Sequence, residues 1–191
     1  YEALMSVTDK NGNYAVFTPF ALPCNINFEK VIETGFQEYA YELLPETYSK
    51  LSALQPTAYE GAWQMWQEGI NKGIFLPQFH GREHLNLRIF NEKMKNNDLD
   101  IITAILNRSY TSIENNLYPT IGYTAAYQFW DYKDNEYFKE NIRDGFAAFE
   151  KVFGYKPVHF NDPGGYEHES LHKTVKELGG KYVDAKRIKK E

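Results

Sequence analysis

The segment Ile74-Phe75-Leu76-Pro77-Gln78-Phe79-His80-Gly81-Arg82-Glu83-His84-Leu85-Asn86 decides the predicted fold. The apolar run from Ile74 to Phe79 has the length of a buried strand. If a helix begins at Gly81, His80 and His84 lie one turn apart on one face, close enough to share one ion. Imidazole is the commonest metal-binding side chain, and strand ends in α/β folds collect functional residues. The segment therefore predicts a metal site at the end of a strand.

Strands and helices alternate on both sides of this segment. Apolar periodicity predicts helices over 28–33, 57–70, 98–107 and 134–153, a last helix ending at Gly179, and strands over 14–20, 157–160 and 181–183. Residues 36–44 are expected to be extended, and 121–131 to include a strand that rises to the same face as His80. Asn86 could donate to a substrate or cap the following helix, and we expect the cap. The alternation predicts an α/β fold.

Composition sets the class of molecule. The chain has 191 residues, of which 42% are hydrophobic, so we expect one domain over 1–191 with a real core. Aromatic residues make up 16%, which suits either sugar stacking or the filling of a core, and core filling is the expected use. A net charge of −5 without a basic stripe argues against nucleic-acid binding. We interpret the basic cluster at Lys186, Arg187, Lys189 and Lys190 as a solvated tail.

The single cysteine, Cys24, excludes an internal disulfide framework and a cysteine-based zinc knuckle, and it leaves the compartment open. No apolar segment is long enough to span a membrane, and no signal peptide is evident. The first residues, Tyr1 to Met5, resemble the middle of a helix and lack both an initiator methionine and a cap. We therefore expect the chain to be a fragment of a longer protein.

A hydrolytic zinc site usually has three protein ligands and an open position, and the histidine pair offers two. The spacing is not that of the zinc-protease helix, because Gly81 stands where that motif has a glutamate. Arg82 and Glu83 supply charged groups that could support the ligands. Several acidic or imidazole side chains are candidates for the third ligand, and the sequence leaves them open: Asp131, Asp162, His159, His168 and His172.

Two stretches resemble the polysaccharide deacetylase family. The segment from His80 to His84, after a short strand, is similar to the second motif of that family, the His-x-x-x-His metal pair of carbohydrate esterases. Phe160-Asn161-Asp162-Pro163-Gly164-Gly165-Tyr166, followed by a helix that ends near Gly179-Gly180-Lys181-Tyr182-Val183, resembles the third motif. The resemblance covers Ile74 to Val183. It implies a distorted (β/α) barrel of the polysaccharide deacetylase type, incomplete in this chain, and a divalent metal, most commonly zinc.

The resemblance also implies roles for single residues. His80 and His84 would be metal ligands, and Arg82, Asp162, Pro163 and Tyr166 would bind the substrate, with Tyr166 as an aromatic wall. The paired aspartates of the first motif are missing, since no Asp-Asp occurs in the chain. The catalytic base is therefore expected upstream of Tyr1. The usual arginine of the third motif is also replaced, and the late catalytic histidine is not evident.

Three functions remain open at this point. The first is a metal-dependent hydrolase that removes acetyl groups from a polysaccharide or oligosaccharide. The second is a carbohydrate-binding or structural domain that keeps the barrel and has lost catalysis, which the missing acid pair favours. The third is a glycoside hydrolase, which needs two carboxylates at strand ends. It ranks last, because the sequence offers no such pair.

Overall fold

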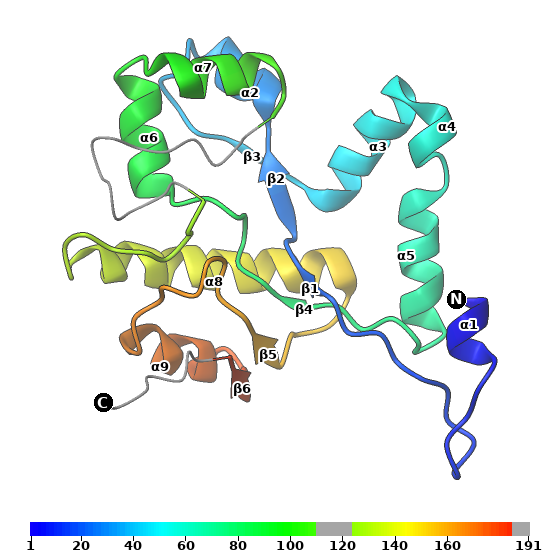
Figure 1. The fold of residues 1–191 in the computed structure, drawn as a ribbon. Coiled ribbons are helices and arrows are strands. Elements are labelled where there is room, and N and C mark those ends of the chain that lie inside the picture. Colours follow the sequence, from blue (N-terminus) through cyan, green and yellow to red (C-terminus); the bar gives the residue numbers. More distant parts are fainter. Residues whose placement is uncertain (110–123, 185–191) are drawn as a thin grey trace.

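The computed structural model of the chain describes residues 1–109 and 124–184. Its main sheet has four parallel strands in the order β1-β4-β5-β6 (Figure 1). They are β1 (Phe20–Ala21), β4 (Gln78–Phe79), β5 (His159–Phe160) and β6 (Tyr182–Val183). An antiparallel pair is formed by β2 (Cys24–Ile26) and β3 (Tyr41–Leu43). The α/β class is thus confirmed, and within the described ranges the parallel strands form an open row and not a closed barrel.

Helices make up most of the regular structure in the described part of the chain. They are α1 (Glu2–Met5), α2 (Phe28–Glu33), α3 (Leu44–Leu54), α4 (Pro56–Tyr59), α5 (Ala62–Asn71), α6 (Leu87–Lys95), α7 (Leu99–Leu106), α8 (Asp134–Phe153) and α9 (Ser170–Glu177). None of these helices combines the length and the apolar character needed to cross a bilayer.

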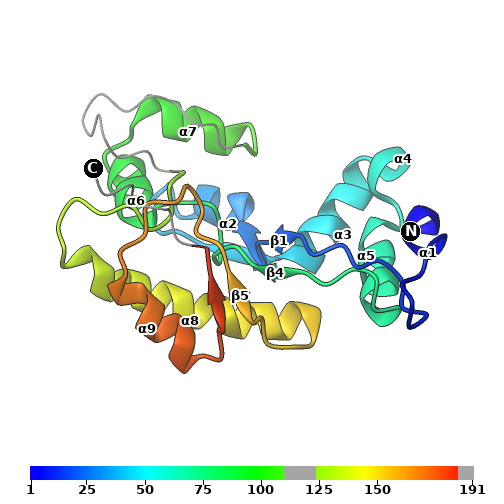
Figure 2. The same cartoon turned by 60° about the horizontal axis from the view of Figure 1, so that its bottom comes forward.

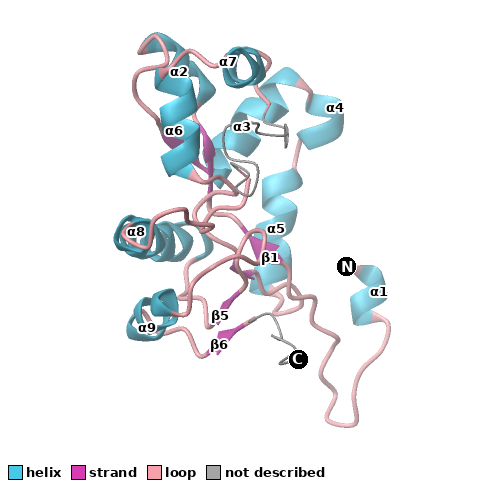
Figure 3. Cartoon of the chain, turned by 60° about the vertical axis from the view of Figure 1, so that its left-hand side comes forward, coloured by secondary structure: helices cyan, strands magenta, loops and turns pink. Residues whose placement is uncertain are grey.

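Helices α8 and α9 cover one face of the main sheet (Figures 2 and 3). Phe79 of β4 is fully buried, and its ring centroid lies 4.6 Å from that of Phe146 and 6.2 Å from that of Phe149 on α8. Gly145 permits this close approach, because a Cβ at that position would lie 2.7 Å from Cζ of Phe79. Packing against α8 therefore fixes β4, and with it the residues that directly follow β4.

A second hydrophobic cluster joins α2, α6 and α7 at the upper left of Figure 1. Phe90 and Met94 of α6 and Ile101 and Ile105 of α7 are fully buried there. Leu85, which follows His84 in sequence, belongs to the same cluster. The histidine segment is therefore held by the main core at its start and by this second core at its end.

The sequence predictions fail where a turn or a long-range contact decides the structure. The helix expected over 57–70 is divided into α4 and α5 at Gly61, whose φ of +77° a helix cannot contain. The extended segment 36–44 contributes only β3, and α3 was not predicted. The strand expected over 14–20 is reduced to β1 and an isolated bridge between Phe17 and Phe75. Part of the strand expected within 121–131 lies outside the described residues, and 124–131 forms turns and bends.

Candidate metal and substrate site

Pairing of β4 with β5 brings the two sequence motifs together. Phe79 and Phe160 are partners in the parallel register, so the residues that follow each strand leave the sheet side by side. The amide of Asn161 donates a hydrogen bond of 3.1 Å to the carbonyl of Phe79. Gly81 then comes so close to the later loop that a Cβ there would lie 3.0 Å from Cγ of Pro163. Two stretches far apart in sequence thus form one site.

The two histidines point their Nδ1 atoms at main-chain carbonyl groups. His80 Nδ1 lies 2.8 Å from the carbonyl oxygen of Asn161, and His84 Nδ1 lies 2.6 Å from that of Thr124. A carbonyl oxygen only accepts hydrogen bonds, so each Nδ1 carries the proton and donates. In its neutral form, each ring therefore keeps its lone pair on Nε2. The ring centroids are 5.2 Å apart, with an interplanar angle of 64°.

Burial lowers the pKa of the His80 imidazole below its ordinary value, and the hydrogen bond to Asn161 opposes that effect. The nearby His84 ring lowers the pKa further, because two positive charges would repel each other. His80 is therefore neutral at neutral pH, which is the state in which an imidazole can bind a metal ion.

The turn between the histidines is not helical, so the helix expected to begin at Gly81 is wrong. Gly81 has a φ of +100°, which opens the chain into bends, and α6 begins only at Leu87. The predicted cap is confirmed, since Asn86 Oδ1 accepts from the amide of Ile89 at 3.4 Å. Asn86 Nδ2 also donates to the carbonyl of Gln128 at 2.6 Å. The imidazoles are thus brought together by tertiary contacts and not by the helical repeat.

A buried charged network lies between the two histidines. Glu83 is 3% exposed and accepts from Arg82 Nε at 2.7 Å and from Asn141 Nδ2 at 3.0 Å. Arg82 also donates to Asp144 at 2.5 Å, and its guanidinium lies 4.3 Å from the ring centroid of Tyr41. The pKa of Arg82 stays raised because these carboxylates outweigh the cost of burial. Arg82, expected to bind substrate, thus already has two carboxylate partners.

The loop after β5 is organised by Asp162. Its Oδ2 accepts from the amides of Tyr166 at 2.5 Å and Glu167 at 3.2 Å, while Oδ1 is buried without a donor among the described residues. Burial, followed by the charge of Glu167, raises the pKa of Asp162 to about 7. Pro163 is buried against Gly81, and Tyr166 is exposed on the loop. Asp162 therefore shapes the loop that carries these two predicted substrate contacts.

The other candidate ligands have partners of their own. His159 Nε2 lies 2.9 Å from Asp184, His168 Nδ1 lies 3.0 Å from Ser170 Oγ, and His172 Nε2 lies 3.3 Å from Glu167. Asp131 accepts from the amide of Lys133. Across residues 1–109 and 124–184, no three His, Cys, Asp or Glu side chains gather as a metal ion would require. The histidine pair thus stands without a third ligand from the described residues.

Sequence reasoning missed the groups that orient the histidines. Both are main-chain carbonyls, of Asn161 and Thr124, and a carbonyl carries no signal in residue type. Asn141 was missed as well, because on α8 it stands among charged residues and only the packing of α8 turns it toward Glu83.

Comparison with known proteins gives one weak structural match and no match in sequence. No model of a protein family and no curated protein matches the chain. Among solved structures, the chain is similar to IcaB from Ammonifex degensii, with a TM-score of 0.39 and 10% sequence identity. The match covers 67% of this chain and 48% of that one, so the chain spans about half of the length of IcaB. A match this weak does not assign a family.

Proposed function

We propose that this chain is part of a metal-dependent hydrolase of the polysaccharide deacetylase type, which removes acetyl groups from a polysaccharide or oligosaccharide. His80 and His84 are its metal ligands, and zinc is the preferred ion. One observation carries the proposal: each Nδ1 donates to a main-chain carbonyl, which leaves both Nε2 atoms as ligands. Histidines that bind metal ions are usually oriented in this way.

The separation of the two rings supports a shared ion. Zinc–nitrogen bonds are about 2.0–2.1 Å long, so two imidazoles at a tetrahedral angle on one ion have ring centroids about 5 Å apart. The observed separation of 5.2 Å agrees with this value. When bound, such an ion polarises the acetyl carbonyl and lowers the pKa of its water toward neutrality.

The remaining residues of the site have supporting roles in this proposal. Glu83 and Arg82 hold the turn between the ligands through buried ion pairs. Asp162 holds the loop that places Tyr166, an exposed aromatic side chain, as a wall for the sugar. The proposal assigns neither the third ligand nor the catalytic base to a described residue. The proposal therefore assigns this chain two ligands and part of the substrate-binding surface.

Zinc binding tests the metal assignment on which the proposal depends. Zinc content and zinc affinity are measured by elemental analysis and calorimetry for the parent chain and for His80→Ala and His84→Ala. His168→Ala is the matched control, because this histidine lies outside the site and pairs with Ser170. We expect one zinc per parent chain, loss of binding in both site variants and no change in the control. A parent chain without zinc would overturn the metal assignment.

A second candidate is a carbohydrate-binding or structural domain that no longer catalyses. The observation that favours it is the missing third ligand among the described residues. It predicts that acetylated oligosaccharides bind, that no acetate is released from them, and that the parent chain holds no zinc. Acetate release that depends on His80 and His84 would exclude it.

A further inference from the structure

The imidazole of His80 lies on the face of the main sheet that points away from α8. Phe79 and Phe160 belong to the main core that α8 covers, and successive side chains of a strand point to opposite faces. His159, one residue before Phe160, is therefore on the same face as His80. The ring centroid of Phe20, on β1, lies 6.1 Å from that of His80 and 4.9 Å from that of His159. The two imidazoles thus share one environment.

Asp184, which directly follows β6, binds two side chains from the end of β5. Its own amide donates to the carbonyl of Phe160 at 3.0 Å, which places the carboxylate beside that strand. Oδ1 lies 2.9 Å from His159 Nε2, and Oδ2 accepts from Asn161 Nδ2 at 3.1 Å. Burial would raise the pKa of the Asp184 carboxyl, but the hydrogen bonds from His159 and Asn161 outweigh it and lower the pKa. Asp184 is therefore a carboxylate at neutral pH.

Asn161 connects this carboxylate to the ring of His80. Its main-chain carbonyl accepts from His80 Nδ1 at 2.8 Å. Burial lowers the pKa of His80, and the carbonyl and the side-chain amide of Asn161 both oppose that effect, so the amide acts on the ring as well. Because Nδ2 of this amide donates to Asp184, its oxygen is left as the acceptor for the imidazole. Asp184, Asn161 and His80 thus form a continuous polar series, here called the Asp184 relay.

The contribution of Asp184 to this relay is the orientation of the Asn161 side chain. The main chain of Asn161 is fixed without it, since the amide of Asn161 donates to the carbonyl of Phe79 at 3.1 Å. Without the carboxylate, the side-chain amide is free to turn over and to present its NH2 group to the ring. The proton on His80 Nδ1 would then meet a second donor. Asp184 therefore decides whether this amide supports or opposes the tautomer that carries its proton on Nδ1.

We propose that Asp184 is a positioning residue for His80: through the side-chain amide of Asn161 it holds the imidazole with its proton on Nδ1 and with Nε2 free for the metal ion. Groups that hold the second nitrogen of a metal-binding histidine typically change metal affinity by about 10–100-fold. The inference rests on the proposed function for the ion, whereas the orientation of the ring does not depend on it. The two therefore have separate tests.

Proton–nitrogen NMR of the imidazoles in the full chain without metal tests the relay directly. The His80 signals are identified by their loss in His80→Ala. We expect a proton on Nδ1 and none on Nε2 in the parent, whereas Asp184→Ala should shift the tautomer toward Nε2 and speed the exchange of the Nδ1 proton. Asp184→Asn keeps an acceptor for Asn161 Nδ2 and should restore the signals of the parent. In a titration with zinc, Asp184→Ala should bind about tenfold more weakly than the parent.

A double variant shows whether Asp184 acts through Asn161. Asn161→Leu removes the side-chain amide and leaves the carbonyl that accepts from His80. In this background, Asp184→Ala should cause no further change in the His80 signals and no further loss of zinc affinity, because the relay is already broken.

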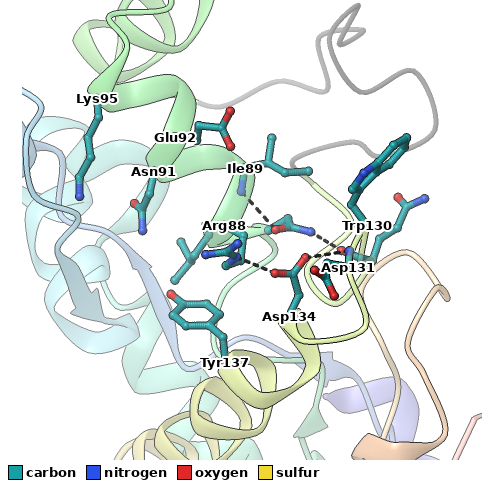
Figure 4. Close-up of a pocket in the computed structure, with 12 residues that line it drawn as sticks. Arg88, Ile89, Asn91, Glu92, Lys95, Trp130, Asp131, Asp134 and Tyr137 are labelled. Carbon is teal, nitrogen blue, oxygen red and sulfur yellow. Dashed lines mark hydrogen bonds and ion pairs between the residues drawn. The ribbon is translucent and has the colours of Figure 1, made fainter.

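Asp134→Ala is the matched control for the loss of a carboxylate. Asp134 pairs with Arg88 at 2.8 Å beside a pocket of about 480 Å³ between α6 and the start of α8, and neither histidine of the site lines this pocket (Figure 4). This variant should keep the His80 signals and the zinc affinity of the parent.

Unchanged His80 signals in Asp184→Ala would overturn the proposal, and so would losses of zinc affinity that add up in the double variant. Failure of the proposed function gives a different result. If the parent binds no zinc but the His80 signals change in Asp184→Ala, the relay stands and the metal assignment fails. If zinc binding depends on His80 while Asp184→Ala leaves both the signals and the affinity unchanged, the metal assignment stands and the relay fails.

Discussion

The imidazole of His80 donates through Nδ1 to the main-chain carbonyl of Asn161, 2.8 Å away and 81 positions later in the sequence. This bond exists because β4 and β5 are neighbours, which places the residue after Phe79 beside the residue after Phe160. The histidine segment and the loop 161–166 therefore depend on each other. A substitution that separates the two should alter the orientation of His80 without touching its ring.

Gly81→Ala is expected to separate them. A Cβ at this position would lie 3.0 Å from Cγ of Pro163 and 3.2 Å from the hydroxyl of Tyr127, at a φ of +100°. We expect a loss of about 1–3 kcal/mol in the free energy of unfolding, from strain and crowding together. Zinc affinity should fall as well, since the carbonyl of Asn161 moves away from His80. Urea unfolding and zinc titration measure the two effects.

Gly154→Ala is the matched control. Gly154 also has a positive φ, of +81°, but a Cβ there would meet nothing within 4 Å. This variant should lose stability through backbone strain alone and keep the zinc affinity of the parent. Equal zinc affinity in both variants would show that the contact between Gly81 and Pro163 does not orient His80.

Gly145→Ala should destabilise the fold although it lies within a helix. Alanine in place of glycine normally stabilises a helix by up to about 1 kcal/mol. Here the new Cβ would lie 2.7 Å from Cζ of Phe79 and 3.0 Å from Cβ of Arg82, and Phe79 is fully buried. We expect a net loss of roughly 1–3 kcal/mol in urea unfolding. Glu140→Ala, on the exposed side of α8, should change stability by less than about 0.5 kcal/mol. An unchanged or higher stability of Gly145→Ala would mean that α8 does not press on β4.

The sequence predicted the helices whose ends carry local signals. Asn27 caps α2 and Gly154 ends α8 with a positive φ, and both ends lie where the pattern placed them. It could not predict the break at Gly61, because a glycine within a periodic apolar stretch is compatible with a continuous helix. The strands are two or three residues long in the described ranges, too short for a periodic signal to mark their ends.

In the candidate site, too, the sequence predicted the features that have a local signal and missed those that long-range packing determines. The sequence proposed His80 and His84 as a pair, and the rings do lie close together, but the reason given for it was wrong. A helical turn needs only local spacing, whereas the observed geometry needs the carbonyls of Asn161 and Thr124, which long-range packing supplies. The burial of Glu83 could not be foreseen either, since it depends on Asn141 and Tyr39 from two distant segments.

Glu83→Gln should lower stability much more than the removal of the second carboxylate that Arg82 contacts. Glu83 is almost completely buried, so its loss leaves Arg82 short of a charge that compensates its desolvation. We expect Glu83→Gln to lower the free energy of unfolding by about 2–4 kcal/mol, measured by urea unfolding. The side chain of Asp144 is 45% exposed, so Asp144→Asn should cost less than about 1 kcal/mol. Equal costs would show that burial of Glu83 does not set the strength of the network.

Asp162 should make the fold less stable as the pH rises. The pKa of Asp162 is about 7 in the folded chain, against about 3.9 in an unfolded one. Between these values the unfolded state loses its proton first and binds fewer protons than the folded state. The free energy of unfolding therefore falls from about pH 4 to about pH 7, by at most about 4 kcal/mol.

Asp162→Asn should abolish this decline, because an amide does not ionise while its oxygen can still accept from the amide of Tyr166. Urea unfolding from pH 4 to pH 8 measures the slope, and the variant should gain on the parent as the pH rises. Glu167→Gln should reduce the decline only in part, since burial is the larger cause of the raised pKa and remains. His172→Gln controls for the imidazole that pairs with Glu167. If the parent and Asp162→Asn have the same slope, the Asp162 carboxyl is ionised at the same pH in the folded and unfolded chains.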